Sequence, residues 1–318
     1  MTTKNPLRRI GEQIQAIMPA HSASSQNAPL AARVIDSYEN VPEVYQEFFA
    51  PHRSKGRKFP YTIVTSTDEA SGETITGKLL CAINHNFYVL EGGENSITKT
   101  CYPIDDIQSV QVVHRPSDML IKVSGTTNLG LPATSTFGCD KESGQLFTPL
   151  FQRIRLRIVS LNEKAPSRRT EKLNRWNDLN THVIDMARHC LLPGETVIEA
   201  ILQPEIRASL FSSDRVFRGA KSPTHICILT DKELVMIRED ISLGKKDKPG
   251  SVCNFVPLTK IHSIALNENG GNLLSISIHL ANGEVFEPLF DASLKDEVEQ
   301  FLTRTRERMP KEKLYRRD

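Results

Sequence analysis

A run of basic residues near position 55 has the residue types and the spacing that suit it to bind an anion. The run contains Arg53, Lys55, Arg57 and Lys58. An arginine can donate two parallel hydrogen bonds to a phosphate or a carboxylate, a lysine supplies a compact positive charge, and Gly56 lets the backbone approach a ligand closely. The alternative is a solvated basic loop that binds nothing, because charged loops are common on protein surfaces.

A second, more widely spaced basic set lies beyond position 200. Its members are Arg207, Arg215, Arg218 and Lys221. Phe211 and Phe217 are interleaved with them, and these aromatic side chains suit either insertion at an interface or packing in the interior. We predict that the residues which contact an anionic headgroup or a partner are Arg53, Lys55, Arg57, Lys58, Arg215, Arg218 and Lys221.

The sequence contains none of the local motifs that mark common enzyme sites. It has no phosphate-binding loop, no dinucleotide-binding glycine pattern, no His-Glu-x-x-His and no Gly-x-Ser-x-Gly. His182 and His189 are the nearest pair of histidines, and on a helix they would be too far apart to bind one metal ion. We predict no catalytic residues, no metal and no cofactor. An enzyme with a site between two domains is an alternative, because distant residues can assemble a triad.

The composition is that of an ordinary globular protein. Of its 318 residues 39% are apolar and 25% are charged, which is too apolar for a disordered chain. The length suits two domains better than one. A net charge of +2 gives no whole-chain argument for a nucleic acid or an anionic surface, so such a case rests on local patches.

The cysteines and the hydropathy indicate a cytoplasmic protein. The six cysteines are scattered and no two have the spacing of a metal knuckle, which favours reduced thiols. No apolar run approaches the roughly 18 residues that a membrane-spanning helix needs. Residues 4–9 do not begin a secretory signal. We therefore expect a cytoplasmic location, with peripheral association at the inner face of the membrane as an extension of it.

The two halves of the chain share several short patterns in the same order. Residues 102–110 match residues 256–264, and both segments contain a proline followed by spaced apolar residues. Val34-Ile35-Asp36 ends a short helical pattern, and Val183-Ile184-Asp185 lies in a similar pattern. Apolar strand candidates precede the proline motifs, and the candidates are residues 79–90 and 226–237. The matches predict two copies of one domain.

Each copy is expected to finish with strands and then a closing helix. Residues 274–280 alternate between apolar and polar, as a strand with one buried face does, and Asn282-Gly283 predicts a tight hairpin in which both residues have positive φ. Ser293 is expected to cap the second closing helix, with a stripe of Leu294, Val298, Phe301 and Leu302. Thr148 is expected to cap the first, with Pro149 at its first position and Leu150, Phe151, Ile154, Ile158 and Leu161 facing inward.

In this order of elements the chain resembles the pleckstrin-homology-like superfamily, in particular bacterial PH and GRAM-type domains in tandem. The residues that carry the resemblance are 227–237, 256–264, the Asn-Gly hairpin and the closing helix. It implies a mainly β fold with capping helices (α+β), formed by two bent antiparallel barrels that are each closed by a C-terminal helix. The closing helices lack the tryptophan of the eukaryotic lipid-binding members, since Trp176 lies between the domains.

Two linkers recognised by composition, over 21–27 and 162–171, bound the first domain, and the resemblance gives the basic run a role. The expected segments are an N-terminal amphipathic helix with a linker over 1–26, a first domain over 27–161, a linker and inter-domain helix over 162–192, a second domain over 193–309 and a basic tail over 310–318. With strands over 43–49 and 59–64, the basic run would be the loop between them, which in PH domains holds a headgroup, often through a Lys-x-Arg pair. Lys55-Gly56-Arg57 has that form.

These observations predict a non-catalytic binding or scaffold protein. Its partner would be another protein or an anionic lipid headgroup, and a nucleic acid that uses the same basic residues is the alternative. Self-association through exposed strand edges, or through the helices around Trp176, would make it a homo-oligomer.

Overall fold

The computed structural model of the chain is mainly β, with a few helices and several antiparallel sheets. It describes residues 31–53, 58–65, 77–92, 96–160, 170–176, 178, 182–207, 220–245, 248–270 and 272–310. The helix that we expected over 1–26 and all but the first residue of the tail expected over 310–318 lie outside this part.

The first half begins with a strand and a helix that precede two groups of strands. Its elements are β1 (Ala32–Ile35), α2 (Glu43–Phe49), β2 (Thr62–Thr65), β3 (Lys78–Ile83), β4 (Asn86–Gly92), β5 (Ile97–Pro103), β6 (Ile107–His114), β7 (Asp118–Thr126), β8 (Pro132–Asp140) and α3 (Gly144–Ile158). A single 3-10 turn, Ile104–Asp106, separates β5 from β6.

The second half follows a 3-10 helix at Glu171–Trp176. Its elements are α4 (His182–Cys190), β9 (Val197–Gln203), β10 (Ile206–Arg207), β11 (Ala220–Ser222), β12 (His225–Thr230), β13 (Glu233–Lys245), β14 (Lys248–Pro257), β15 (Ile261–Glu268), β16 (Leu273–Leu280), β17 (Val285–Phe286), β18 (Leu289–Asp291) and α5 (Lys295–Arg308). The 3-10 turn Leu258–Lys260 separates β14 from β15. The apolar segments 79–90 and 226–237 are therefore hairpins, and each contains two strands.

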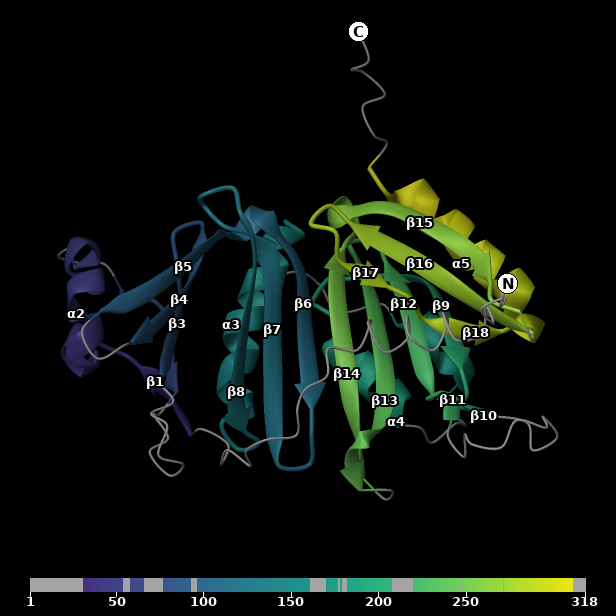
Figure 1. Ribbon diagram of the computed structural model, residues 1–318, viewed down its shortest axis with the longest axis horizontal. Coiled ribbons are helices and arrows are strands. Elements are labelled where there is room, and N and C mark those ends of the chain that lie inside the picture. Colours follow the sequence, from purple (N-terminus) through teal and green to yellow (C-terminus); the bar gives the residue numbers. More distant parts are fainter. Residues whose placement is uncertain are drawn as a thin grey trace, which may run out of the picture.

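The strands of the two halves join in one central sheet. Its order is β8-β7-β6-β14-β13-β12-β9, so the halves meet where β6 pairs with β14 (Figure 1). The other sheets are β1-β2-β3-β4-β5, the sheet β15-β16-β17 with β18 on β16, and the ribbon β10-β11. The prediction of two closed barrels was wrong: in the described residues no sheet closes on itself, because the edge of β6 bonds to the other half.

The 3-10 turns of the two halves have the same local geometry. The amide of Ile104 donates to the carbonyl of His85 at 2.8 Å, and the amide of Leu258 donates to the carbonyl of Lys232 at 2.9 Å. After each turn the next strand has a register shift, at Ile107 in β6 and at Ile261 in β15. A proline ends the strand before each turn, which is what the sequence match at 102–110 and 256–264 reflects.

Helices fill the spaces between these sheets. The buried face of α3 includes Phe147, Leu150, Phe151 and Ile154, and it shares one core with α4 and the central sheet. Both helices lie behind that sheet in Figure 1. In α5 the buried residues include Val298, Phe301 and Leu302, which pack between β12–β14 and β15–β16. The inward stripes expected for both closing helices are thus confirmed at six positions: Leu150, Phe151, Ile154, Val298, Phe301 and Leu302.

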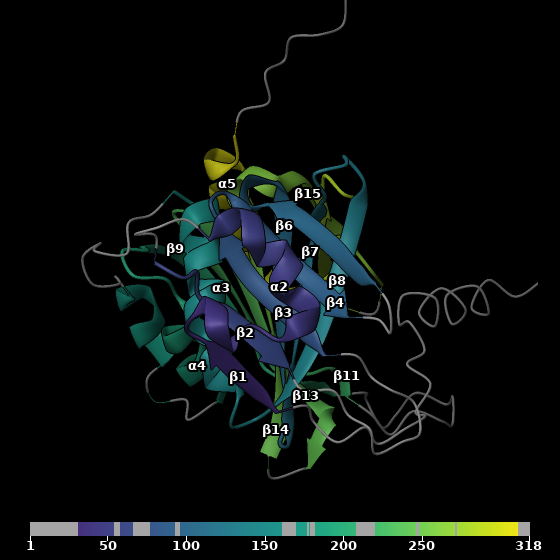
Figure 2. The same ribbon diagram turned by 90° about the vertical axis from the view of Figure 1, so that its left-hand side faces the viewer.

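The segment that we expected to be the first strand, Glu43–Phe49, is the helix α2. Its apolar residues are compatible with either period, and the side chains that the fold buries, Tyr45 and Phe49, are four apart on one helical face. They pack with Leu79 and Leu90 on the outer face of the first sheet, which α2 crosses in Figure 2. The helical pattern expected at Val34-Ile35-Asp36 was also wrong, because β1 pairs there with β2.

Both closing helices begin differently from the prediction. The helix α3 begins at Gly144, so Pro149 lies inside it and Thr148 is not its cap. The side chain of Asp140 accepts a hydrogen bond from the amide of Ser143 at 2.6 Å and sets this earlier start. Before α5, the side chain of Asp291 accepts from the amide of Ser293 at 2.9 Å and caps the 3-10 turn Ala292–Leu294, while the N-cap of α5 is Leu294 and not Ser293.

A buried arginine ties α3 to the second half of the chain. Arg155 donates from Nη2 to Oε2 of Glu233 on β13 at 2.6 Å and from Nη1 to the carbonyl of Cys190 at 2.9 Å. The side chains of Arg155 and Glu233 are 8% and 0% exposed. The guanidinium carbon of Arg155 lies 3.7 Å from the centroid of the Phe255 ring. This cluster fixes where α3 sits relative to the second half.

A second carboxylate extends the cluster. Glu195 accepts hydrogen bonds from the amide of Leu192 at 2.6 Å and from the hydroxyl of Thr230 at 2.9 Å. Burial raises the pKa of Glu195 to about 7, and the charge of Glu233 adds to this effect, while Arg155 opposes it. Arg155 forms its ion pair with Glu233, and Glu195 holds a proton more tightly in the folded protein.

We expect Arg155→Ala to lower the free energy of unfolding by about 3–5 kcal/mol, because Glu233 would remain buried without its cation. Urea unfolding measures the change. Arg304→Ala is a matched control, since Arg304 forms an exposed ion pair with Glu307 on α5, and it should change stability little. Equal effects of the two substitutions would contradict the role assigned to Arg155.

We expect the free energy of unfolding to fall as the pH rises from about 4.5 to about 7 by up to about 3 kcal/mol from Glu195. Over this range the unfolded chain releases the Glu195 proton while the folded chain retains it. Urea midpoints across the range measure the slope. In Glu195→Gln the slope should flatten and stability above pH 7 should rise; an unchanged slope would refute the assignment.

Candidate functional site

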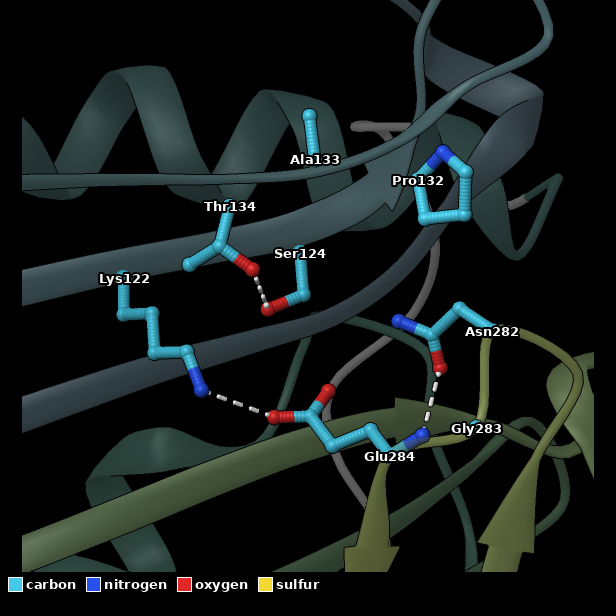
Figure 3. A pocket seen from close by; sticks show the side chains of 8 residues that line it. All are labelled: Lys122, Ser124, Pro132, Ala133, Thr134, Asn282, Gly283 and Glu284. Atoms are coloured by element: carbon cyan, nitrogen blue, oxygen red, sulfur yellow. Dashed lines mark hydrogen bonds and ion pairs between the residues drawn. The ribbon is translucent and has the colours of Figure 1, made fainter. Parts of the chain in front are cut away.

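A surface hollow of about 400 Å³ lies where the two halves meet (Figure 3). Its lining comes from β7 and β8 of the first half and from the turn between β16 and β17 of the second. The lining residues are Lys122, Ser124, Pro132, Ala133, Thr134, Asn282, Gly283 and Glu284. We refer to this hollow as the junction groove.

Glu284 holds the second-half turn against the first half. Its Oε1 lies 3.0 Å from Nζ of Lys122 on β7, and its Oε2 accepts from the hydroxyl of Ser109 on β6 at 2.7 Å. On the floor of the groove the hydroxyls of Ser124 and Thr134 lie 3.1 Å apart. Figure 3 shows Lys122 and Glu284 facing each other across the groove from opposite halves.

The turn that carries Glu284 is the hairpin expected at Asn282-Gly283, with a different conformation. Only Gly283 of the two has positive φ, at 84°. The Asn282 side chain accepts from the Glu284 amide at 3.1 Å, and the Leu280 amide donates to the Glu284 carbonyl at 2.8 Å. Because three residues separate Leu280 from Glu284, the turn is longer than the tight two-residue form and presents Glu284 to the first half.

The chemistry of the junction groove is that of a hydrogen-bonding surface. Lys122 and Glu284 neutralise each other, and the remaining polar side chains are hydroxyls and an amide. Its lining contains no His, Asp or Cys. In the described part of the chain, no group of three or more His, Cys, Asp or Glu side chains could hold a metal ion.

The rim of the groove carries most of the exposed large apolar side chains of the described residues. Among the described residues, four large hydrophobic residues are exposed: Leu129 at 77%, Leu131 at 61%, Val44 at 45% and Val285 at 42%. Leu129 and Leu131 lie on the β7–β8 turn, and Val285 follows Glu284. Leu129 and Leu131 therefore lie next to the lining residue Pro132, and Val285 begins β17 next to the lining residue Glu284, whereas Val44 lies on α2.

The basic residues that the sequence predicted do not come together at this groove. Arg53 follows α2 and forms an exposed ion pair with Glu39 at 3.2 Å, and Lys58 is exposed beyond it. Lys221 lies in β11, at the opposite end of the long axis from α2 (Figure 1). The remaining predicted residues, Lys55, Arg57, Arg215 and Arg218, lie outside the described residues. Since Glu43–Phe49 is helical, the basic run follows a helix and does not join two strands.

Sequence reasoning missed the residues that build the groove. Lys122 and Glu284 are 162 positions apart, and neither stands in a motif. A signal did exist for the rim: Leu129 and Leu131 flank Gly130 between two strands, where polar turn residues are the norm. Leucines in such a turn have no strand face on which to be buried.

Comparison with known proteins adds no family to this description. No protein-family model matches the chain, and no curated protein matches it. No helix in the described residues combines the length and the apolar character needed to cross a membrane.

The six cysteines form no disulfide, and they differ in access to solvent. Cys190 is half-buried at the end of α4, and its sulfur lies 3.8 Å from that of the buried Cys253. Burial raises the pKa of Cys139 and of Cys227 to about 12, which suppresses their reactive thiolate forms.

We expect a thiol reagent such as DTNB to modify one cysteine of the native protein quickly, and that cysteine is Cys190. The others should react only on unfolding, because their sulfurs are buried. The absorbance of the released thionitrobenzoate measures the number of thiols that have reacted. In Cys190→Ser the fast phase should vanish; a fast phase that persists in this variant would contradict the burial of the other five.

Proposed function

We propose that this protein is a non-catalytic scaffold of two PH-like units and that it binds a protein partner at the junction groove. The observation that carries the proposal is the presence of exposed aliphatic side chains next to a polar, hydrogen-bonding groove: Leu129 and Leu131 on the β7–β8 turn and Val285 at the start of β17. Apolar side chains that rim a polar groove suit the apolar and backbone groups of a polypeptide.

The electrostatics favour a protein partner over an anionic headgroup. An anion needs an excess of positive charge, and Lys122 in the groove is neutralised by Glu284 at 3.0 Å. Of the basic residues predicted from the sequence, Arg53 forms an ion pair with Glu39. The groove therefore favours a partner that carries little net charge where it binds.

The order of elements supports the assignment to PH-like units. In each half an antiparallel group of strands, β1–β5 in the first and β9, β12, β13 and β14 in the second, leads through a 3-10 turn into a second group of strands and then a helix. The helix buries its apolar stripe between the two groups. Because one fold can serve many functions, the function is argued from the groove and its rim and not from this order.

The proposal predicts that Leu129→Ser with Leu131→Ser weakens partner binding by about tenfold or more, because it removes the aliphatic rim. The partner is captured by a photo-crosslinking amino acid placed at position 285 in the protein's own cells, and its apparent affinity is then measured with the purified pair. The melting temperature should stay constant, since both leucines are exposed.

Val44→Ser is the control, because Val44 is also an exposed aliphatic residue, at 45%, but lies on α2. A crosslinker at position 44 should not capture the same protein. Crosslinks that are identical from both positions, or binding that survives the double substitution, would refute the groove as the binding site.

The same preparation tests the two alternatives. Co-sedimentation with anionic vesicles that is lost in Lys55→Glu with Arg57→Glu would move the function to the basic run. A salt-sensitive gel shift with DNA or RNA would favour a nucleic acid. Binding to neither supports a protein partner.

A further inference from the structure

In each half one strand precedes and one strand follows the 3-10 turn at Ile104–Asp106 or at Leu258–Lys260. The junction between the halves uses only two of these four strands. The junction pairs β6, which follows the turn of the first half, with β14, which leads into the turn of the second. Their counterparts are β5 and β15. Among the described residues, β5 and β15 are both edge strands of their sheets.

The correspondence between these strands can be made residue by residue. Pro103 ends β5 and Pro257 ends β14, while Ile107 begins β6 and Ile261 begins β15, and both pairs differ by 154 positions (257 − 103 and 261 − 107). The register shifts at the start of β6 and β15 fall at the same places. A junction-like pairing of β15 with β5 thus has a defined register.

Several counterparts of the residues that the junction buries are more exposed, although Cys101 and Ile264 are buried like Phe255 and Val110. Ser251, Val252 and Cys253 of β14 are buried, whereas their counterparts in β5 are half-buried Ile97 and exposed Thr98 and Lys99. Ser109 of β6 is 3% exposed. Its counterpart in β15, Ser263, is exposed.

The backbone groups at the two edges point the right way for this pairing. The carbonyl of Ile264 accepts from Nη2 of Arg306 at 3.2 Å, and the carbonyl of Cys101 accepts from the amide of Asn128 at 2.9 Å. Neither donor is the strand's ladder partner, so both carbonyls face the open edge. Ile264 and Cys101 are the counterparts of Val110 and Phe255, which pair with each other at the junction.

We infer that β15 of one molecule pairs with β5 of a second copy of this chain, in the register of the β6–β14 junction. The residue pairs are Ile264 with Cys101, Ala265 with Thr100, Leu266 with Lys99, Asn267 with Thr98 and Glu268 with Ile97. The contact is head to tail, so each molecule retains one edge of each kind and the assembly grows into chains or closes into rings. This inference is independent of the proposed function.

The charges on the two edges are complementary. Glu268 and Lys99 lie two residues apart on the same face of the paired strands, which places them as diagonal neighbours. Both are exposed, and in the single molecule Glu268 forms an exposed pair with Lys295 at 3.1 Å. Lys99 enters no ion pair among the described residues, so the second copy supplies it with one.

The contact is weaker than the internal junction. The helix α5 carries Arg306 where α3 carries Arg155, since the buried Phe301 and Leu302 correspond to Leu150 and Phe151. At the internal junction Arg155 binds Glu233, and the counterpart of Glu233 in the first half is Asn86. In the contact between copies, Arg306 would therefore meet Asn86 and not a carboxylate. Arg306 and Asn128 must also release the two edge carbonyls. The association is therefore reversible.

Sedimentation velocity over a concentration series tests the inference. The wild-type chain should pass from monomer to larger species as its concentration rises. Lys99→Glu and Glu268→Lys, made separately, should each raise the apparent Kd roughly three- to tenfold, because each places like charges beside each other. An equimolar mixture of the two variants should recover the wild-type association, because every contact between unlike variants again pairs opposite charges.

Lys141→Glu, a charge reversal at an exposed position away from both edges, is the control and should associate as the wild type does. The melting temperatures should be alike, since all three positions are exposed. A chain that stays monomeric at every concentration would overturn the inference. So would association that Lys99→Glu and Glu268→Lys do not weaken, or that mixing does not restore.

Discussion

The backbone ladder between β6 and β14 is the constraint on which the rest of this structure depends. Buried amides and carbonyls must be paired, and here the open edges of the two halves pair with each other over five residue positions. The side chains along this ladder, including Val112, Val113 and Cys253, form part of the interior. Because the ladder makes one sheet of two halves, it also decides that neither half closes into a barrel of its own.

The ladder buries a set of polar groups, and removing these groups from water costs free energy. Arg155 crosses from α3 to Glu233, and Glu195 lies near enough for its pKa to be raised by burial and by the second carboxylate. Removing ions from water costs free energy that their attraction does not always offset, so such a cluster is better understood as fixing position than as adding stability. It defines one placement of α3 on the second half, where an apolar contact alone would permit several.

The surface features follow from the same placement. Once β6 and β14 are paired, the β16–β17 turn lies against β7, Glu284 reaches Lys122 and Ser109, and a groove forms between turns that carry Leu129, Leu131 and Val285. The groove therefore exists only because the two halves are joined. The pairing of β6 with β14 leaves their counterparts β5 and β15 as edge strands. The same pairing therefore produces both the groove and the edges available to a second copy.

The sequence by itself determined the local elements and their order. Its period of two located β16, and the stripe of Val298, Phe301 and Leu302 located α5, because a single buried face leaves its period in the chain. It failed at Glu43–Phe49, whose apolar residues fit a strand as well as a helix. Only the tertiary structure decided the pairing of β6 with β14, the partner of Arg155 and the meeting of Lys122 with Glu284. Apolar patterning says that a strand is buried but not beside which strand, and a charge on the sequence does not name its counter-ion 162 positions away.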